Sequence, residues 1–189
     1  TEEAFENAVM HLLTMGGSTN GILHLQAIYH EAGLGELPLS VFDEFSRKIP
    51  QVASIYPASE FDMVDFYEGG GVPAVLKEIE EYLHKDTLTV SGLTMGEALS
   101  RFSYTNNRNM IKTAEEPFAP TGGVAILKGN IAPLGCVIKP AAVPKHMFRY
   151  SGRAQVFTTE EESYQAVLEG RVKPGTCMVL MYEGPKGGP

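Results

Sequence analysis

The feature that most constrains the fold is a change of pattern near residue 86. Before it, apolar residues recur at the three- and four-residue spacing of helices, as at Phe5, Val9 and Leu13. After it, apolar runs are short and are separated by glycine and proline, which is typical of strands joined by turns. We therefore expect a mixed α/β chain, with a helical part over residues 1–86 and a β-rich part over residues 87–189.

Four helices are expected in the first part and one in the second. Glycine, proline and N-capping residues mark their ends. The predicted bounds are residues 2–15, 18–32, 38–47, 74–83 and 160–169. The second of these helices carries apolar residues over more than half of its circumference, so we expect it to be well buried.

Short apolar runs predict the strands, at residues 52–56, 123–128, 135–139, 153–157 and 176–182. The last strand contains an unbroken apolar run, which favours a strand buried on both faces. Residues 103–120 are polar and contain Asn and Pro, so we expect a long loop there. Arg101-Phe102-Ser103 has neither flanking glycines nor a partner base, and it reads as a junction between a helix and this loop.

Charge and composition exclude two classes of protein. The formal net charge is -8, whereas a general nucleic-acid binder needs clustered Lys and Arg. No apolar run approaches the roughly 18 residues that span a bilayer, so we expect no membrane association.

Cys136 and Cys177 lie far apart with no CxxC spacing, which favours free thiols in a cytoplasmic protein. The acidic N-terminus lacks an initiator Met, and we expect the chain to be a piece of a longer protein.

The first candidate site is the sequence Gly16-Gly17-Ser18-Thr19-Asn20. Two hydroxyls, an amide and free backbone N–H groups at the start of a helix can cradle a carboxylate or a phosphate. The alternative is structural, because Ser or Thr caps helices and glycines permit a tight bend. Ser18, Thr19 and Asn20 are therefore candidate substrate-binding residues.

Three consecutive glycines, at residues 69–71, precede Pro73 in the first turn of a predicted helix. This arrangement is either a tight turn or a contact for an anion, and it lacks the spacing and the lysine of a phosphate-binding loop. The five histidines show no HxxxH or HExxH spacing, so we expect no histidine metal site.

The second candidate site is the segment Tyr182–Pro189, which follows the last predicted strand and is dense in glycine and proline. A carboxylate residue located where the chain leaves a strand and enters such a turn has a well-defined position. It is suited to binding a hard metal ion or to transferring a proton. Glu183 is the candidate. The alternative is an exposed turn in which Glu183 and Lys186 carry incidental charges.

Six sequence blocks, taken together and in order, resemble the dihydroxy-acid and sugar-acid dehydratases, the family that also includes phosphogluconate dehydratase. The blocks are GGSTNGILHL (16–25), FDEFSRKIP (42–50), EGGGVPAVLKE (68–78), LTVSG (88–92), PTGGVAILKGNIAP (120–133) and YEGPKGGP (182–189). They extend over nearly the whole chain, and the block at 68–78 is more similar to the dihydroxy-acid branch.

The resemblance implies an enzyme that dehydrates a 2,3-dihydroxy acid to a 2-oxo acid with an iron–sulfur cluster and Mg²⁺. In this family an open iron of the cluster acts as a Lewis acid on the departing 3-hydroxyl, Mg²⁺ holds the carboxylate and the 2-hydroxyl, and a serine alkoxide takes the C2 proton. These roles are physically sensible, because hydroxide is a poor leaving group and the C2 proton is weakly acidic. The partner is thus a small dihydroxy acid, and the resemblance implies a homo-oligomer, a dimer or a tetramer.

Carried onto this sequence, the resemblance makes Glu183 a ligand of Mg²⁺. It places the cluster cysteines before residue 1 and the catalytic serine after Pro189, so no catalytic residue lies in this chain and we expect residues 1–189 alone to be inactive. It also implies that residues 1–86 are the helical end of an N-terminal α/β domain, and that residues 87–189 are part of a swivelling β/β/α barrel-like domain. The competing interpretation is a non-catalytic binding or assembly module.

Overall fold

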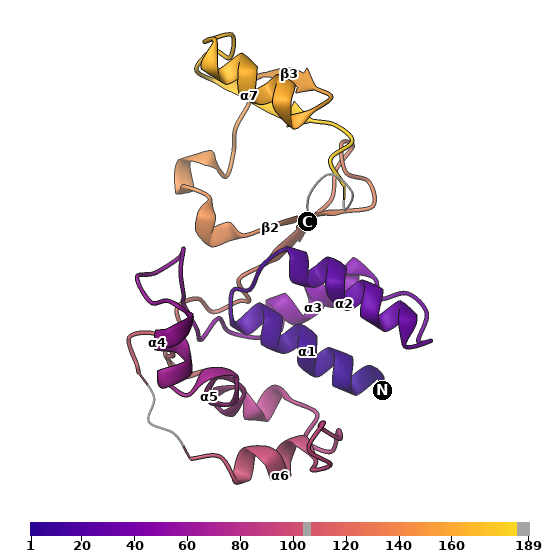
Figure 1. The fold of residues 1–189 in the computed structure, drawn as a ribbon, viewed down its shortest axis with the longest axis vertical. Helices are drawn as coiled ribbons and strands as arrows, with labels where there is room; N and C mark the ends of the chain where they lie inside the picture. The colour runs from indigo at the N-terminus through magenta and orange to yellow at the C-terminus, as the bar shows by residue number, and fades with distance from the viewer. Residues whose placement is uncertain (104–106, 185–189) are drawn as a thin grey trace. The chain divides into compact units, whose positions relative to one another are not determined.

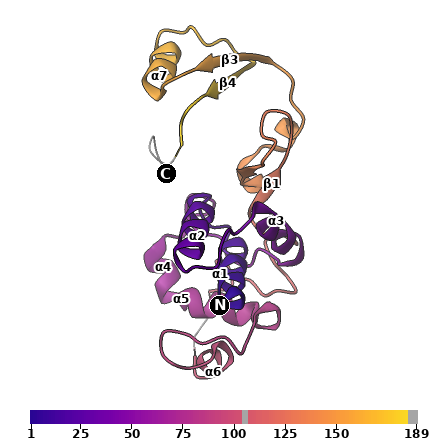
Figure 2. The same cartoon turned by 90° about the vertical axis from the view of Figure 1, so that its right-hand side faces the viewer.

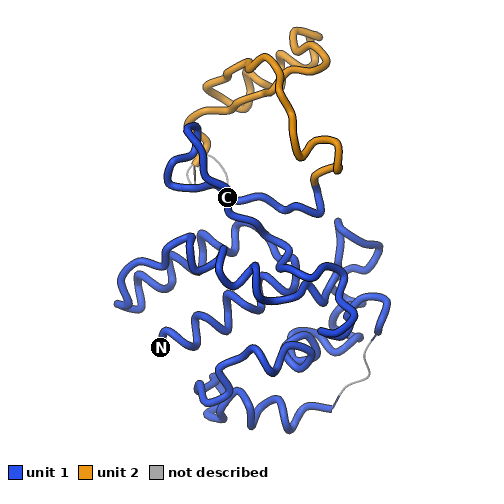
Figure 3. The backbone as a smooth tube through the Cα atoms, turned by 180° about the vertical axis from the view of Figure 1, so that it is seen from behind, with its two compact units in different colours: residues 1–142 blue, residues 143–189 orange. Residues whose placement is uncertain are grey.

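A computed structural model describes residues 1–103 and 107–184 of the chain, and these residues fall into two compact units (Figure 3). Unit 1 ends at Ala142, and unit 2 begins at Val143. Helices and small sheets are both present, which confirms the mixed α/β class. The predicted domain boundary near residue 86 lies inside unit 1 and stays a prediction.

Unit 1 is built around helix α1 (Glu2–Thr14), which contacts α2 (Asn20–Glu31), α3 (Leu39–Lys48) and α5 (Gly71–Glu78) (Figure 1). The Thr1 side chain caps α1 by accepting a hydrogen bond from the N–H of Ala4. The bounds of these helices confirm the predictions to within a few residues. The exception is α5, which starts three residues early and gives way to the 3₁₀ helix η1 (Glu80–Tyr82).

Two short helices were missed by the periodicity argument, α4 (Met63–Glu68) and α6 (Met95–Ser100). Each is too short to show a helical repeat, and each begins with a capping box. In α6 the hydroxyl of Thr94 accepts from the N–H of Glu97, and the carboxylate of Glu97 accepts from the N–H of Thr94. Arg101 caps the end of α6, which confirms the helix-to-loop junction there.

One hydrophobic core fills unit 1 and is contributed by the helices and by the segments around residues 52 and 111. Its largest fully buried members in this unit are Met10, Leu13, Ile22, Phe42, Ile49, Ile79, Met110 and Ile111. The prediction that α2 is well buried is wrong for the described residues. Only Ile22 and Tyr29 of α2 are buried, whereas Ile28 is 56% exposed.

The predicted strand at residues 52–56 is replaced by two isolated antiparallel bridges, Gln51 with Ala119 and Ala53 with Ile111. Thr14, at the end of α1, supplies further partners for this segment. Its carbonyl accepts from the N–H groups of Val52 and Ala53, and its hydroxyl donates to the carbonyl of Pro50 at 2.6 Å. The polar groups of a buried, non-regular segment are satisfied in this way.

The sheet of unit 1 is a pair of antiparallel strands, β1 (Ala125–Leu127) and β2 (Cys136–Ile138), with Ile126 opposite Val137. Helix α3 packs beside β1 (Figure 2). Both strands lie inside the predicted bounds and are shorter than predicted. The 3₁₀ helix η2 (Pro140–Ala142) ends the unit.

Unit 2 contains the 3₁₀ helix η3 (Lys145–Met147) and a β–α–β arrangement of β3 (Arg153–Phe157), α7 (Glu160–Leu168) and β4 (Thr176–Leu180). The two strands pair in parallel and in register, with Phe157 beside Leu180. Phe157 and Ala166 are buried where α7 covers the sheet. The prediction that the last strand is fully buried is wrong for the described residues, because Met178 and Leu180 are 38% and 39% exposed.

Among the helices of residues 1–103 and 107–184, every one is too short or too polar to cross a bilayer.

His11 of α1 is partly exposed, but one of its ring nitrogens is buried. Its Nε2 atom is shielded from solvent and has no hydrogen-bond partner among the described residues. Burial lowers the pKa of its imidazole below the ordinary value of 6.5, because the charged form loses its hydration.

This lowered pKa predicts a pH-dependent stability. Below the pKa that His11 has in the unfolded chain, the unfolded chain binds a proton at this residue and the folded chain does not. The free energy of unfolding should therefore fall as pH drops from about 7.5 to about 5.5. His11→Gln removes the titrating group and should flatten this dependence, whereas His24→Gln, at an exposed position of α2, serves as the control. Urea unfolding at both pH values measures the effect, and an unchanged slope in His11→Gln contradicts it.

Candidate functional site

The turn between α1 and α2 is formed by Gly16 and Gly17. The N–H of Gly16 donates to the carbonyl of Leu13 at 3.1 Å, and that of Gly17 donates to the carbonyl of Leu12 at 2.9 Å. Gly16 has a φ of +59°, a left-handed conformation that glycine adopts without strain. The turn delivers Ser18, Thr19 and Asn20 at the N-terminus of α2.

The residues of this loop are partly or fully exposed. Ser18 is exposed, and its hydroxyl accepts from the N–H of Asn20 at 3.2 Å. Thr19 occupies the N-cap position but makes no capping hydrogen bond with its side chain. Within residues 1–103 and 107–184 the Thr19 hydroxyl and the Asn20 amide have no hydrogen-bond partner. Thr19 therefore makes no capping hydrogen bond, whereas the bond that Ser18 accepts from the N–H of Asn20 is of the kind that the structural alternative expects.

A second glycine pair, Gly122-Gly123, packs directly against the first. The N–H of Gly123 donates to the carbonyl of Leu13 at 2.9 Å, and the N–H of Gly122 donates to the carbonyl of Ser46 at 2.7 Å. A Cβ atom on Gly123 would overlap the Cα atom of Gly16. Backbone therefore meets backbone here, and only glycine at position 123 permits so close an approach.

Gln51 lies against both glycine turns. A Cβ atom on Gly16 would sit 2.5 Å from Nε2 of Gln51, and one on Gly123 would sit 3.0 Å from its Oε1. The side chain is held in turn, since Nε2 donates to the carbonyl of Ala53 at 3.1 Å. The residue is only 8% exposed. Sequence reasoning missed Gln51, because no local pattern distinguishes it; the two glycine pairs were the visible signal.

Glu183 lies in unit 2, directly after β4. The N–H of Met181 donates to the carbonyl of Phe157 at 2.9 Å, which extends the pairing of the strands by one residue. Tyr182 then takes a φ of 65°, rare for a residue with a side chain, and turns the chain. The Glu183 carboxylate is exposed and has no ion-pair partner among the described residues. Lys186, the other charge of this motif, lies outside the described residues.

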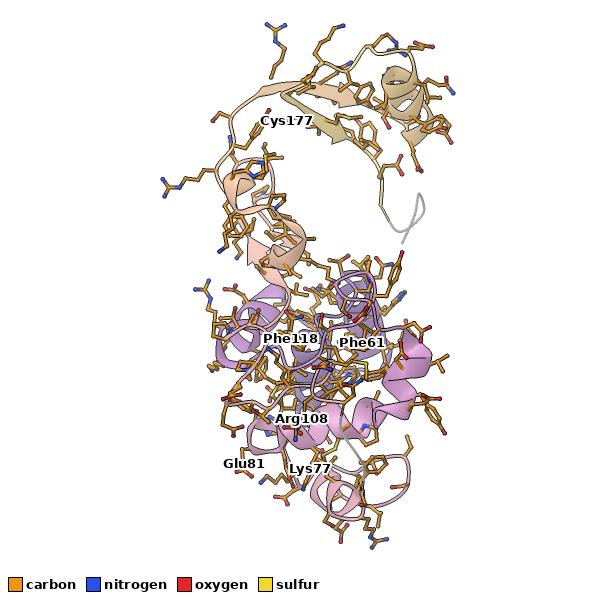
Figure 4. All side chains as sticks on the ribbon, turned by 90° about the vertical axis from the view of Figure 1, so that its left-hand side faces the viewer. Phe61, Lys77, Glu81, Arg108, Phe118 and Cys177 are labelled. Atoms are coloured by element: carbon orange, nitrogen blue, oxygen red, sulfur yellow. The ribbon has the colours of Figure 1, made fainter. Side chains whose placement is uncertain are left out.

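The described residues do not form a complete site for either metal group that the resemblance implies. Among them, no three His, Cys, Asp or Glu side chains come together. The two cysteines are free and lie in different units, Cys136 at the start of β2 and Cys177 on β4. Figure 4 labels Cys177. A cluster is usually held by several thiolates, so this chain does not fit one. Glu183 fits the role of one oxygen ligand among several.

The glycines at residues 69–71 form the turn between α4 and α5. Gly70 and Gly71 have φ values of 105° and 61°, and Gly70 is the N-cap of α5. A Cβ atom on Gly69 would lie 2.5 Å from the methyl carbon of Met110. These contacts explain the glycines structurally, and the anion contact stays a prediction.

The contact between the glycine turns yields a stability prediction. Gly123→Ala forces apart two backbone segments that side-chain rotation cannot relieve, and it should lower the free energy of unfolding by about 1–3 kcal/mol. Gly129→Ala is the matched control, because no atom lies within 4 Å of its added Cβ. Urea unfolding of both variants measures the difference, and equal midpoints for the two would refute the contact.

Comparison with known proteins gives two family matches. Residues 1–98 match the N-terminal model of the dihydroxy-acid/6-phosphogluconate dehydratases, and residues 109–189 match the C-terminal model.

Similar proteins cover the whole chain. It is 46% identical over 191 residues to a dihydroxy-acid dehydratase of Ignicoccus hospitalis. It is 47% identical over 192 residues to one of Methanosarcina barkeri, and 46% identical over 191 residues to one of Caldanaerobacter subterraneus. All of this chain aligns in each case, and it spans 34% of the relative's length. The two family models match the chain in order, which confirms the predicted resemblance. The chain belongs to the dihydroxy-acid/6-phosphogluconate dehydratase family.

Proposed function

We propose that the polypeptide carrying these residues is a hydro-lyase that converts a 2,3-dihydroxy carboxylic acid, of the dihydroxy-acid or aldonic-acid class, to a 2-oxo acid. The observation that carries the proposal is the full-length alignment of this chain to proteins named dihydroxy-acid dehydratase. The reaction balances without an oxidant, because the C3 hydroxyl and the C2 proton leave together as water. The enol that results tautomerises to the 2-oxo acid.

Within this reaction, we assign substrate binding to Ser18, Thr19 and Asn20. Two hydroxyls and a carboxamide are the groups that recognise a substrate rich in hydroxyls. They stand at the N-terminus of α2, a helix of 12 residues whose dipole favours a carboxylate there. The free Thr19 hydroxyl and Asn20 amide support this assignment.

For Glu183 we propose the role of a Mg²⁺ ligand. Its exposed, unpaired carboxylate directly after a strand supports the role, and the further ligands would come from elsewhere in the polypeptide. When bound, Mg²⁺ would neutralise the substrate carboxylate and so acidify the C2 proton. Since the described residues do not fit an iron–sulfur cluster, we assign none of them to it.

The remaining parts of the proposal concern the whole polypeptide. In this proposal residues 1–86 belong to its N-terminal dehydratase domain and residues 87–189 to a swivelling C-terminal domain. The order of the two family models supports two domains, and the N-terminal model extends past residue 86 to residue 98. We also propose a cytoplasmic homo-oligomer. Residues 1–189 alone carry no turnover, because the resemblance puts the catalytic serine and the cluster ligands outside them.

Assay of the complete polypeptide tests the function. Incubation with a branched 2,3-dihydroxy acid or an aldonic acid should give a 2-oxo acid, trapped as its hydrazone, whereas residues 1–189 expressed alone should give none. A complete, metal-loaded polypeptide that binds such acids without converting them would favour the binding-module interpretation instead.

Substitution of the proposed metal ligand is the second test. Glu183→Gln removes the anionic oxygen and should lower kcat/KM by about 100-fold or more, with a higher Mg²⁺ concentration needed for half-maximal activity. Glu169→Gln is the matched control, since Glu169 is an exposed carboxylate of the same unit that pairs with Arg171. If Glu183→Gln keeps the wild-type Mg²⁺ dependence, Glu183 is not a ligand.

A further inference from the structure

We propose that Gln51 is a positioning residue for substrate binding, which acts by fixing the Gly16-Gly17 turn and, through it, the loop Ser18–Asn20. The inference rests on the proposed function, because the loop matters for catalysis only if it binds substrate. Gln51 itself is buried and is given no contact with substrate.

The geometry makes Gln51 the third component of a three-part contact. Its Nε2 atom lies against Gly16, its Oε1 atom lies against Gly123, and the two glycines touch one another. Gly16 is two residues from Ser18, so a displacement of the turn moves the loop with it. No side chain on Gly16 or Gly123 can fill the space if Gln51 is shortened.

The backbone of Gln51 is anchored independently of its side chain. Its N–H donates to the carbonyl of Ala119 at 3.0 Å, and its carbonyl accepts from the N–H of Phe118 at 2.9 Å. The side-chain amide donates to the carbonyl of Ala53 at 3.1 Å, which fixes the direction of the side chain. A substitution at position 51 therefore keeps the backbone bridge to Ala119 and Phe118, and it removes the contact with the turn together with the side-chain hydrogen bond to Ala53.

The second glycine pair closes the arrangement from the other side. Gly123 is held by Leu13, and Gly122 is held by Ser46, whose hydroxyl also donates to the carbonyl of Val124. Hydrogen bonds with α1 and α3 thus hold the segment before β1 next to the Gly16-Gly17 turn, on which Gln51 also packs. The turn that precedes the loop is held in place, and preorganisation of this kind lowers the entropy cost of binding a ligand.

The first measurement is amide hydrogen exchange, which does not depend on enzymatic activity. In the complete polypeptide, Gln51→Ala should increase amide hydrogen exchange in the segment 16–20. Gln26→Ala is the matched control, since Gln26 also donates its amide to a backbone carbonyl, that of Leu37 at 2.8 Å, but lies far along α2 from the turn. Unchanged exchange at 16–20 in Gln51→Ala overturns the positioning role.

The second measurement is kinetic. Gln51→Ala should raise KM about tenfold or more, with kcat per folded molecule kept within about twofold, because a misplaced contact weakens binding. Gln51→Met should recover much of the affinity, since an unbranched side chain of similar length fills the same space. It also keeps the test valid if Gln51→Ala does not fold. A loss of active protein at unchanged KM in both variants indicates a purely structural residue and overturns the inference.

The variants Ser18→Ala and Asn20→Ala separate this inference from the function beneath it. If they raise KM while the Gln51 variants do not, the loop binds substrate and the positioning role alone fails. If they leave KM unchanged in an active dehydratase, the loop is not a substrate site, and the positioning role fails with it. A polypeptide without dehydratase activity contradicts the proposed function itself, whatever the exchange data show.

Discussion

The close approach of Gly16 to Gly123 is the contact on which the arrangement of unit 1 depends. It joins the end of α1 to the segment that leads into β1, and it leaves no room for a side chain on Gly123. The hydrogen bonds from Gly122 to Ser46 and from Gly123 to Leu13 tie α3 and α1 to the same point. Helices, bridged segments and sheet therefore meet at one place, and the candidate substrate loop starts there.

Local patterns predicted most elements of this fold, because each left a signature within a few residues. The helices at residues 2–14 and 160–168 and the strand at 153–157 follow from spacing and capping alone. The short helices α4 and α6 escaped the periodicity argument, although Thr94 and Glu97 before and within α6 match the sequence signature of a capping box. The segment at 52–56 has the composition of a strand but finds its partners in Thr14 and in isolated bridges, which only the tertiary structure supplies.

The candidate site residues could be predicted from their types and positions in the sequence, but the residue that contacts the turn beneath them could not. Ser18, Thr19 and Asn20 were recognisable as a polar cluster at the start of a helix, and Glu183 as a carboxylate after a strand. Gln51 was not recognisable, since its role comes from contacts with glycines far away in the sequence. The burial predictions for α2 and β4 were wrong for the described residues. Apolar side chains in a sequence indicate that burial is favourable, but they do not show which segment would bury them.

The carbonyl of Leu13 links the last turn of α1 to Gly123, and this link has a consequence for the order of events during synthesis. Domains generally fold as units while the chain emerges from the ribosome, N-terminal parts first. Helix α1 is synthesised more than a hundred residues before Gly123. Its contacts with α2, α3 and α5 involve segments that are made before Gly123, whereas the hydrogen bond from Gly123 to Leu13 has to form after them. The two glycine turns therefore meet late in the folding of unit 1, after its helices have begun to pack.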